Sequence, residues 1–184
     1  MPDRRFGVST HLFHDRRLTR DDIVDVAAHH FELIELFATR SHLDYRDPSA
    51  VAALAEWLSD TRVGLHAVHA PVMEAMRGGQ WVGSFSIAAS DDARRKAAVA
   101  EAEAALAIAT TIPFEYLVVH LGMPKGQQVP PGDNQPDAAR RSINQIVDAA
   151  ARVNVRVALE VIPNPLSGAA GLVEEIEDRL EGID

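Results

Sequence analysis

The chain has 184 residues, of which 47% are apolar and 24% are charged, the balance of a globular protein with room for a sizeable core. It contains no cysteine, which excludes disulfides, thiolate metal sites and cysteine nucleophiles and suits a reducing cytoplasm. The formal net charge is −9, and this argues against a nucleic-acid partner, because nucleic-acid binding draws on basic surfaces. The apolar runs are too short for a membrane span and no signal peptide is visible, so we expect a cytoplasmic protein without a membrane partner.

Strand-like runs recur along the chain, and each is followed by a helix-like run. The strand-like runs are short and nearly continuously apolar, as strands buried on both faces are. In chain order they cover residues 6–13, 32–38, 63–71, 115–122 and 155–162.

The runs between them carry helix start signals and helical periodicity. Thr19 comes three residues before Asp22, which is a capping pattern, and Pro48 lies at a first-turn position that tolerates proline. Two more helices are predicted, from residue 93 to about residue 110 and from Pro136 onward. Apolar stripes with helical spacing support three of the helices. The helix after Pro48 has Val51, Leu54, Ala55 and Leu58, and the helix after Pro136 has Ile143, Ile146, Val147 and Ala150. A last helix is predicted from Leu172, Val173, Ile176 and Leu180.

The order of these runs predicts an α/β fold with five βα units, a parallel sheet covered by helices, in a single domain over residues 1–184. Two loops, residues 72–89 and 123–135, are long for such units and follow the carboxyl ends of strands. Parallel α/β folds place their sites at that end, and loops of this length are more often functional than idle.

Three polar residues stand near the carboxyl ends of successive strands: His69, His120 and Glu160. Alternation along the third strand places His69 on one face with Ala67 and Leu65, and it places His66 on the opposite face, toward the helices. Two imidazoles and a carboxylate suit a divalent metal ion, and a cation would offset the cost of a buried carboxylate. The alternative is that each is an ordinary buried residue with its own hydrogen bonds.

Three more residues near the same carboxyl ends of the strands are predicted to contact a substrate. His11 lies near the end of the first strand, Glu35 is a carboxylate within the second, and Asn164 lies just past the fifth. Each has a structural alternative, and for Asn164 this is a turn.

Several motifs in order along the chain resemble the xylose isomerase-like TIM-barrel superfamily: GVSTHLF, IELFATR, VHAPV, VVHLG and ALEVIPN. That group includes sugar-phosphate isomerases and epimerases, tagatose-type epimerases and the endonuclease IV type of DNA-repair enzyme. The resemblance implies that Glu160 is a metal ligand that also acts as an acid or base, and that His69 and His120 are metal ligands as in the endonuclease branch. A complete barrel has eight βα units and ~250 residues, so we expect an incomplete parallel (βα) barrel, truncated after its fifth unit, whose exposed edges favour a homo-oligomer.

These observations lead to one main hypothesis and two alternatives. The main hypothesis is a metal-dependent isomerase or epimerase that removes a proton next to the carbonyl of a small sugar or sugar phosphate, with Mn, Mg, Co or Zn as the cofactor. The first alternative is an endonuclease IV-like phosphodiesterase on abasic DNA, which two histidine ligands favour and the acidic charge opposes. The second is a partial barrel that binds a metal or ligand without turnover.

Overall fold

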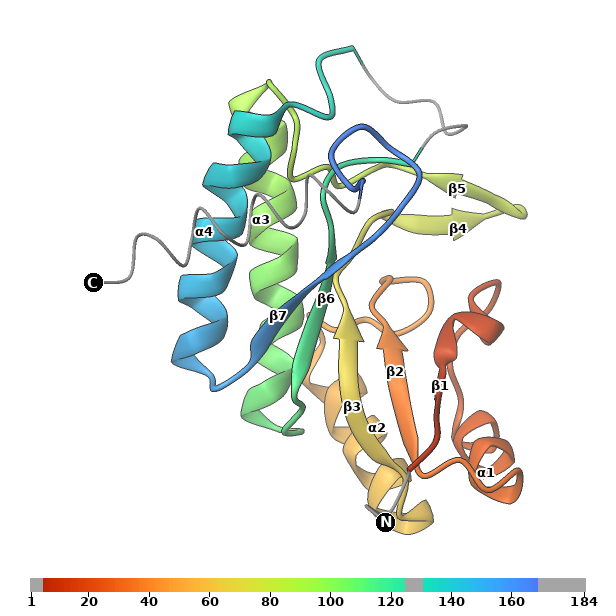
Figure 1. Cartoon of the computed structure of the whole chain (residues 1–184). Coiled ribbons are helices and arrows are strands. Elements are labelled where there is room, and N and C mark those ends of the chain that lie inside the picture. Colours follow the sequence, from red (N-terminus) through yellow and green to blue (C-terminus); the bar gives the residue numbers. More distant parts are fainter. Residues whose placement is uncertain (1–4, 125–130, 169–184) are drawn as a thin grey trace.

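The computed structural model describes residues 5–124 and 131–168, in which a parallel five-stranded sheet is the central element. The strands lie in the order β1-β2-β3-β6-β7, and every neighbouring pair is parallel, as the sequence predicts. Figure 1 shows the strands side by side, with their carboxyl ends at the top. Their bounds are Gly7–Ser9 for β1, Leu33–Phe37 for β2, Gly64–His69 for β3, Tyr116–His120 for β6 and Arg156–Glu160 for β7.

Four α-helices of the described residues begin close to the predicted positions. They are α1 (Arg20–Ala28), α2 (Pro48–Thr61), α3 (Asp92–Leu106) and α4 (Pro136–Arg152). The predicted cap of α1 is confirmed, because the Thr19 amide and hydroxyl both donate to the Asp22 carboxylate, at 2.9 and 2.8 Å. Short 3₁₀ helices, η1 (Thr10–Phe13) and η2 (Ala107–Thr110), follow β1 and α3. The predicted last helix with Leu172, Val173, Ile176 and Leu180 lies outside the described residues.

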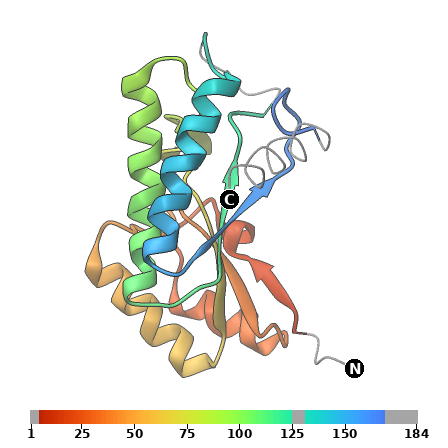
Figure 2. The ribbon, with the colours of Figure 1, turned by 60° about the vertical axis from the view of Figure 1, so that its left-hand side comes forward.

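The helices cover one face of the sheet, and Figure 2 shows α3 and α4 standing on that side. The sheet residues that face the helices are apolar and at most 2% exposed: Ile34, Leu36, Val68, Leu117 and Val119. From the helices, the buried members of the predicted stripes pack onto them: Val51, Leu54, Leu58, Ile143, Ile146 and Ala150. The apolar residues that the sequence pattern assigns to the helices and to the strands therefore pack into one hydrophobic core.

Two segments differ from the prediction in their local structure. The first strand ends at Ser9 and continues as η1, so His11 lies on a 3₁₀ turn and not within the strand. The loop at residues 72–89 contains an antiparallel hairpin, β4 (Ala75–Arg77) and β5 (Gln80–Val82). Its turn is Gly78-Gly79, with φ values of +57° and +76°, as the tight turns that suit hairpins require.

A β-bulge in β3 changes the faces that simple alternation predicts. The pairing with β2 goes from Leu65 (with Ile34) to Ala67 (with Glu35), so His66 is the extra residue. Leu65 therefore belongs to the helix-facing core, and the prediction that it shares a face with His69 is wrong. The prediction that His66 faces the helices is also wrong: its side chain is 41% exposed and lies against the Tyr116 ring, with the ring centroids 5.4 Å apart.

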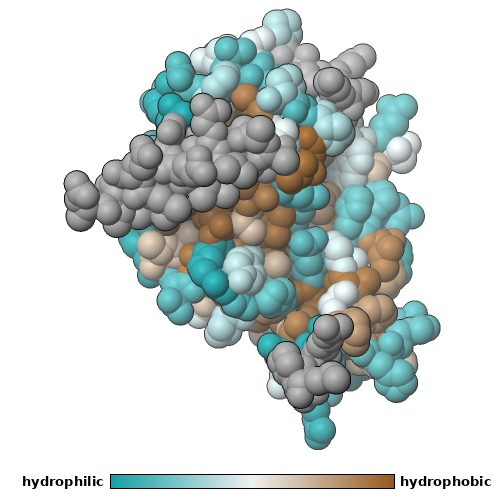
Figure 3. Space-filling model, in the orientation of Figure 1, coloured by the Kyte–Doolittle hydropathy of each residue, from teal (hydrophilic) through white to brown (hydrophobic). Residues whose placement is uncertain are grey.

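The other face of the sheet carries no helix among the described residues. Figure 3, in the orientation of Figure 1, shows apolar residues gathered in the middle of this view with hydrophilic residues around them. Val161, which follows β7, is 63% exposed, and Phe6, which precedes β1, is 66% exposed. Among the helices in the described part of the chain, none has the length and apolar character that crossing a membrane requires.

Candidate metal centre

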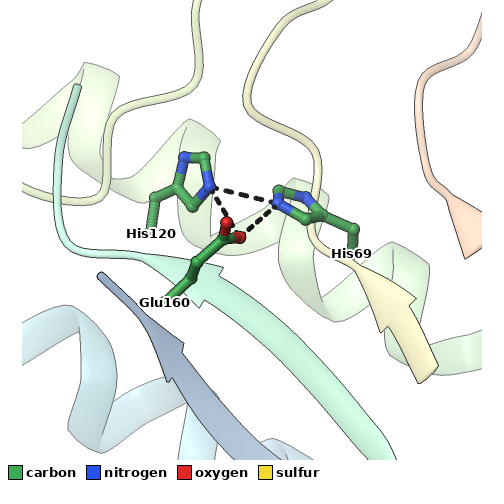
Figure 4. Close-up of side chains that lie close together, drawn as sticks. All are labelled: His69, His120 and Glu160. Atoms are coloured by element: carbon green, nitrogen blue, oxygen red, sulfur yellow. Dashed lines mark hydrogen bonds and ion pairs between the residues drawn. The ribbon is translucent and has the colours of Figure 1, made fainter. Parts of the chain in front are cut away.

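The three predicted ligands are the last residues of three neighbouring strands. His69 ends β3, His120 ends β6 and Glu160 ends β7, and the β6–β7 register pairs His120 with Glu160 directly. Parallel strands bring their carboxyl ends to one edge of the sheet, so the side chains converge there (Figure 4). The two Nε2 atoms lie 3.1 Å apart, and Oε2 of Glu160 lies 3.1 Å from Nε2 of His69 and 3.0 Å from Nε2 of His120.

The hydrogen bonds around the two imidazoles indicate which atoms are available as ligands. Nδ1 of His69 lies 2.9 Å from the Ala70 carbonyl oxygen, and because a carbonyl only accepts, Nδ1 carries the proton. In the neutral tautomer Nε2 of His69 then has a lone pair that points at Glu160. Nδ1 of His120 is buried and has no hydrogen-bond partner among the described residues, so these residues do not fix the tautomer of His120, and its Nε2 faces Glu160 and His69.

The charges at the cluster affect one another strongly. The contact with His69, helped by His120 and opposed by partial burial, lowers the pKa of Glu160 to about 2. Burial lowers the pKa of His120, and the neighbouring His69 lowers it further. Burial also acts to lower the pKa of His69, but the contacts with Glu160 and the Ala70 carbonyl outweigh it and raise that pKa. Glu160 is therefore an anion at neutral pH, with two imidazole nitrogens turned toward one of its oxygens.

The donor set fits a divalent metal ion. Two neutral imidazole nitrogens and a carboxylate oxygen are all acceptors, so their close approach needs a proton or a cation between them. Ligands on neighbouring corners of an octahedron lie about 3.0 Å apart when each is about 2.1 Å from the ion, and the observed separations are 3.0 to 3.1 Å. Three ligands from the described residues would leave coordination positions for further ligands, water or a substrate.

A cavity of about 520 Å³ adjoins the cluster, and it brings in two of the other predicted residues. Glu35 lies on its wall, and its Oε1 accepts a hydrogen bond of 2.8 Å from the Ser9 hydroxyl. His11 lies at the mouth, where burial and the neighbouring His14 and His69 lower its pKa. The residues that line the cavity are Ser9, His11, Glu35, Phe37, His69, Val72, Met73, Trp81, Val118, His120, Pro124 and Glu160.

Aromatic residues that the sequence analysis did not single out form one side of this cavity. Trp81 of the β4–β5 hairpin lies edge-on to Phe37, with centroids 5.8 Å apart, and stacks on His14 at 5.5 Å. The hairpin is held there by a hydrogen bond of 3.0 Å from the Met76 amide to the Ser41 hydroxyl. The sequence signal was the Gly-Gly pair at residues 78 and 79, which predicts a tight turn between two short strands.

Asn164 lies apart from the cavity lining. It is 9% exposed, and its amide group bonds four backbone groups: it donates to the carbonyls of Leu121 and Met123 at 2.6 and 3.3 Å. It also accepts from the amides of Leu166 and Ser167 at 2.8 and 2.9 Å. These bonds tie the turn after β7 to the turn after β6, so the geometry gives Asn164 a structural role beside the site.

Comparisons with solved structures identify the same architecture. A D-tagatose 3-epimerase-like protein is 23% identical, with a TM-score of 0.72 and coverage of 95% of this chain and 61% of the other. A D-psicose 3-epimerase, solved in the presence of D-fructose, is 18% identical, with a TM-score of 0.70 and coverage of 95% and 60%. A xylose isomerase-like TIM barrel protein from Mycobacterium smegmatis, in complex with magnesium, is 14% identical, with a TM-score of 0.69 and coverage of 95% and 60%.

The chain spans about three-fifths of the length of these three proteins, so its five parallel strands correspond to part of a barrel. No curated protein matches the chain in sequence. The sequence model of a protein family, described as "Xylose isomerase-like TIM barrel", matches residues 23–184. With its parallel βα units and its sheet-end cluster, the chain therefore belongs to the family of xylose isomerase-like TIM barrels.

Proposed function

We propose that this protein is a metal-dependent isomerase or epimerase that acts on a small sugar or sugar phosphate. One observation carries the proposal: three metal-ligand atoms, from His69, His120 and Glu160, lie within 3.1 Å of one another at the edge of a cavity of about 520 Å³. The structural neighbours support the proposal. One is a D-tagatose 3-epimerase-like protein and another is a D-psicose 3-epimerase solved in the presence of D-fructose. A third was solved in complex with magnesium.

In the proposed reaction a C–H bond next to the substrate carbonyl breaks, its electron pair forms an enediolate, and the proton moves to a carboxylate that later returns it to carbon. We assign this proton transfer to Glu160, whose Oε2 contacts both imidazoles, while no hydrogen bond among the described residues involves its Oε1. When bound, a divalent cation would polarise the carbonyl oxygen and stabilise the negative charge that develops on it.

Other residues of the cavity would hold the substrate. His11 and the Ser9–Glu35 pair supply hydrogen-bonding groups on the wall. The hairpin with Trp81 lies over the same space and would exclude water from it.

The experiment is to measure metal content and thermal stability for the wild-type chain and for Glu160→Gln and His120→Ala. Binding to the folded state alone stabilises a protein by about 2.7 kcal/mol when the free metal is at 100 times its Kd. Mn²⁺, Zn²⁺, Co²⁺ or Mg²⁺ should therefore raise the melting temperature of the wild type, and each variant should lose this shift.

Glu103→Gln is the matched control, because Glu103 is exposed on α3 and the change removes the same charge as Glu160→Gln. It should retain both the bound metal and the shift in melting temperature. Equal metal content in wild type, Glu160→Gln and His120→Ala would refute the metal centre.

A second candidate is hydrolysis of a phosphodiester in abasic DNA, and the two imidazoles in the donor set favour it. The net charge of −9 opposes it. Incubation of the metal-loaded chain with excess abasic duplex at moderate salt should show neither tight binding nor cleavage. If the chain cleaves abasic DNA and Glu160→Gln abolishes this cleavage, DNA hydrolysis becomes the better supported function. If the chain binds metal but shows no turnover, a non-catalytic metal-binding protein is favoured.

Three related predictions belong to this proposal. We propose that residues 1–184 act as one domain, that the chain associates with a second copy, and that it works in the reducing cytoplasm, as its lack of cysteine favours. Sedimentation of the purified chain measures the second of these directly.

A further inference from the structure

Residues 38–43, which follow β2 and are here called the anchor loop, hold the β4–β5 hairpin in place. The Ser41 hydroxyl accepts a hydrogen bond of 3.0 Å from the Met76 amide of β4. Arg40 forms an ion pair of 3.4 Å with Glu74, the residue before β4. The Trp81 side chain of β5 lines the cavity, so its position over the cavity depends on the anchor loop.

His42 of the anchor loop is completely buried, with 0% of its surface exposed. Its Nδ1 lies 2.8 Å from the Arg16 carbonyl oxygen, and because a carbonyl only accepts, Nδ1 carries the proton. Its own carbonyl accepts a hydrogen bond of 2.9 Å from the Leu18 amide. Its Nε2 is buried and has no hydrogen-bond partner among the described residues. The neutral imidazole therefore fits this place, with an unused lone pair on Nε2.

A second proton on this imidazole would be costly, because no acceptor of the described chain lies within hydrogen-bond reach of Nε2. The charged groups around His42 are Asp22 of α1, with Arg16 and His14 from the segment that follows η1. Both oxygens of Asp22 are already bonded, to Arg16 and Thr19. Burial lowers the pKa of His42; the Arg16 carbonyl and Asp22 act to raise it, whereas the Arg16 guanidinium and His14 lower it further.

We propose that the anchor loop is an acid-sensitive device, in which protonation of His42 displaces the loop and releases the β4–β5 hairpin from the cavity. At neutral pH the imidazole is uncharged whether the loop is closed or displaced, so it does not affect the balance between the two forms. Below about pH 6.5 an exposed imidazole takes up a proton more readily than the buried one. The closed form therefore loses stability as the pH falls further, and the hairpin loses the support of Ser41 and Arg40.

Trp81 provides the measurement. The chain has two tryptophans, and the other, Trp57, lies on α2 against the helix-facing core. In the full-length chain with Trp57→Phe, quenching by acrylamide reports the exposure of Trp81 alone. We expect the quenching constant to rise by about twofold or more from about pH 7.5 to about pH 5.5. The rise should reverse when the pH is restored, and the far-UV circular dichroism should stay unchanged.

His42→Asn keeps a side-chain donor near the position of Nδ1 but cannot be protonated, so it should abolish the rise in quenching. His29→Asn is the matched control, because Nδ1 of His29 also lies 2.8 Å from a backbone carbonyl, that of Asp25, but the residue is exposed. This variant should retain the rise. A contribution from His14, which stacks on Trp81, or from the metal-ligand histidines would persist in His42→Asn.

Three results would overturn the inference: a quenching constant that does not change between the two pH values, an equal rise in His42→Asn, or a loss of circular dichroism in parallel with the rise. If His42→Asn does not fold, an NMR titration of the wild-type chain decides. The assigned ring signals of His42 should change from the neutral to the protonated form over the same pH range as the rise in quenching. Protonation over a different range would also contradict the inference.

Discussion

The two faces of the sheet differ in composition: one forms the hydrophobic core and the other carries the polar residues of the cavity. Toward the helices, side chains such as Ile34, Val68 and Leu117 are fully buried and apolar. Toward the other side, the same strands carry Glu35 and, at their ends, His69, His120 and Glu160. Successive residues of a strand point to opposite faces, so one short sequence can supply the core with one set of residues and the cavity with the other.

The difference between the two faces shows where an unpaired polar group is tolerated energetically. On the helix side, an unpaired polar atom would remain buried without water or partner, at a cost of about 1–3 kcal/mol. On the cavity side, the side chain of Glu160 is 45% exposed, and a cation or substrate can complete its contacts.

Val119 and Val118 are neighbours on β6 that point to opposite faces. Val119 is 2% exposed in the core, whereas Val118 lines the cavity beside His69. Val119→Ala should lower the free energy of unfolding by about 2–3 kcal/mol, from lost burial plus the void left behind. Val118→Ala should lower it by less than about 1 kcal/mol. Urea denaturation of both variants measures the difference, and equal losses would show that the two faces contribute alike to stability.

Asn164 combines features of both faces, because it is buried like the core residues but lies close to the metal-ligand cluster. Asn164→Ala removes an amide that bonds four backbone groups, so the free energy of unfolding should fall by about 2 kcal/mol. The measurement is urea denaturation in parallel with metal content. A variant of wild-type stability that had lost only sugar binding would instead give Asn164 the substrate-contacting role predicted from the sequence.

Asp22 is a polar group on the helix side that is satisfied within the protein. Burial alone would raise its pKa, but the hydrogen bonds from Arg16 and from the Thr19 hydroxyl and amide outweigh burial and lower it. A carboxyl group with a lowered folded-state pKa stabilises the fold above its unfolded pKa of about 4 and loses that contribution as the pH falls through the folded value.

Asp22→Asn should therefore be less stable than the wild type by about 1 kcal/mol above about pH 5. The gap should close as the pH falls below about 4. Melting temperatures of the two proteins from pH 3 to pH 7 measure it, and a gap that is the same at every pH would exclude the ionised carboxylate as its cause.

Much of the fold could be predicted because the signals were local. The cap at Thr19, the stripe of Val51, Leu54 and Leu58, and the apolar run of β6 each specify one element. The bulge at His66 could not be predicted, because it arises from the pairing of β3 with β2 and not from the residues of β3 themselves. The hairpin with Trp81 was missed although Gly78 and Gly79 mark its turn, since each of its strands has only three residues.

By itself, the sequence determined which strands end in a metal-ligand side chain, since His69, His120 and Glu160 stand near the carboxyl ends of three apolar runs. Only the tertiary structure decided that their donor atoms lie 3.0 to 3.1 Å apart, that Glu35 shares their cavity with Trp81, and that the amide group of Asn164 bonds backbone groups of two turns beside the cavity. The physical reason is that the residues of one strand specify that strand and its ends, whereas strand order, register and bulges arise from the pairing of different strands and set the faces and distances of their side chains.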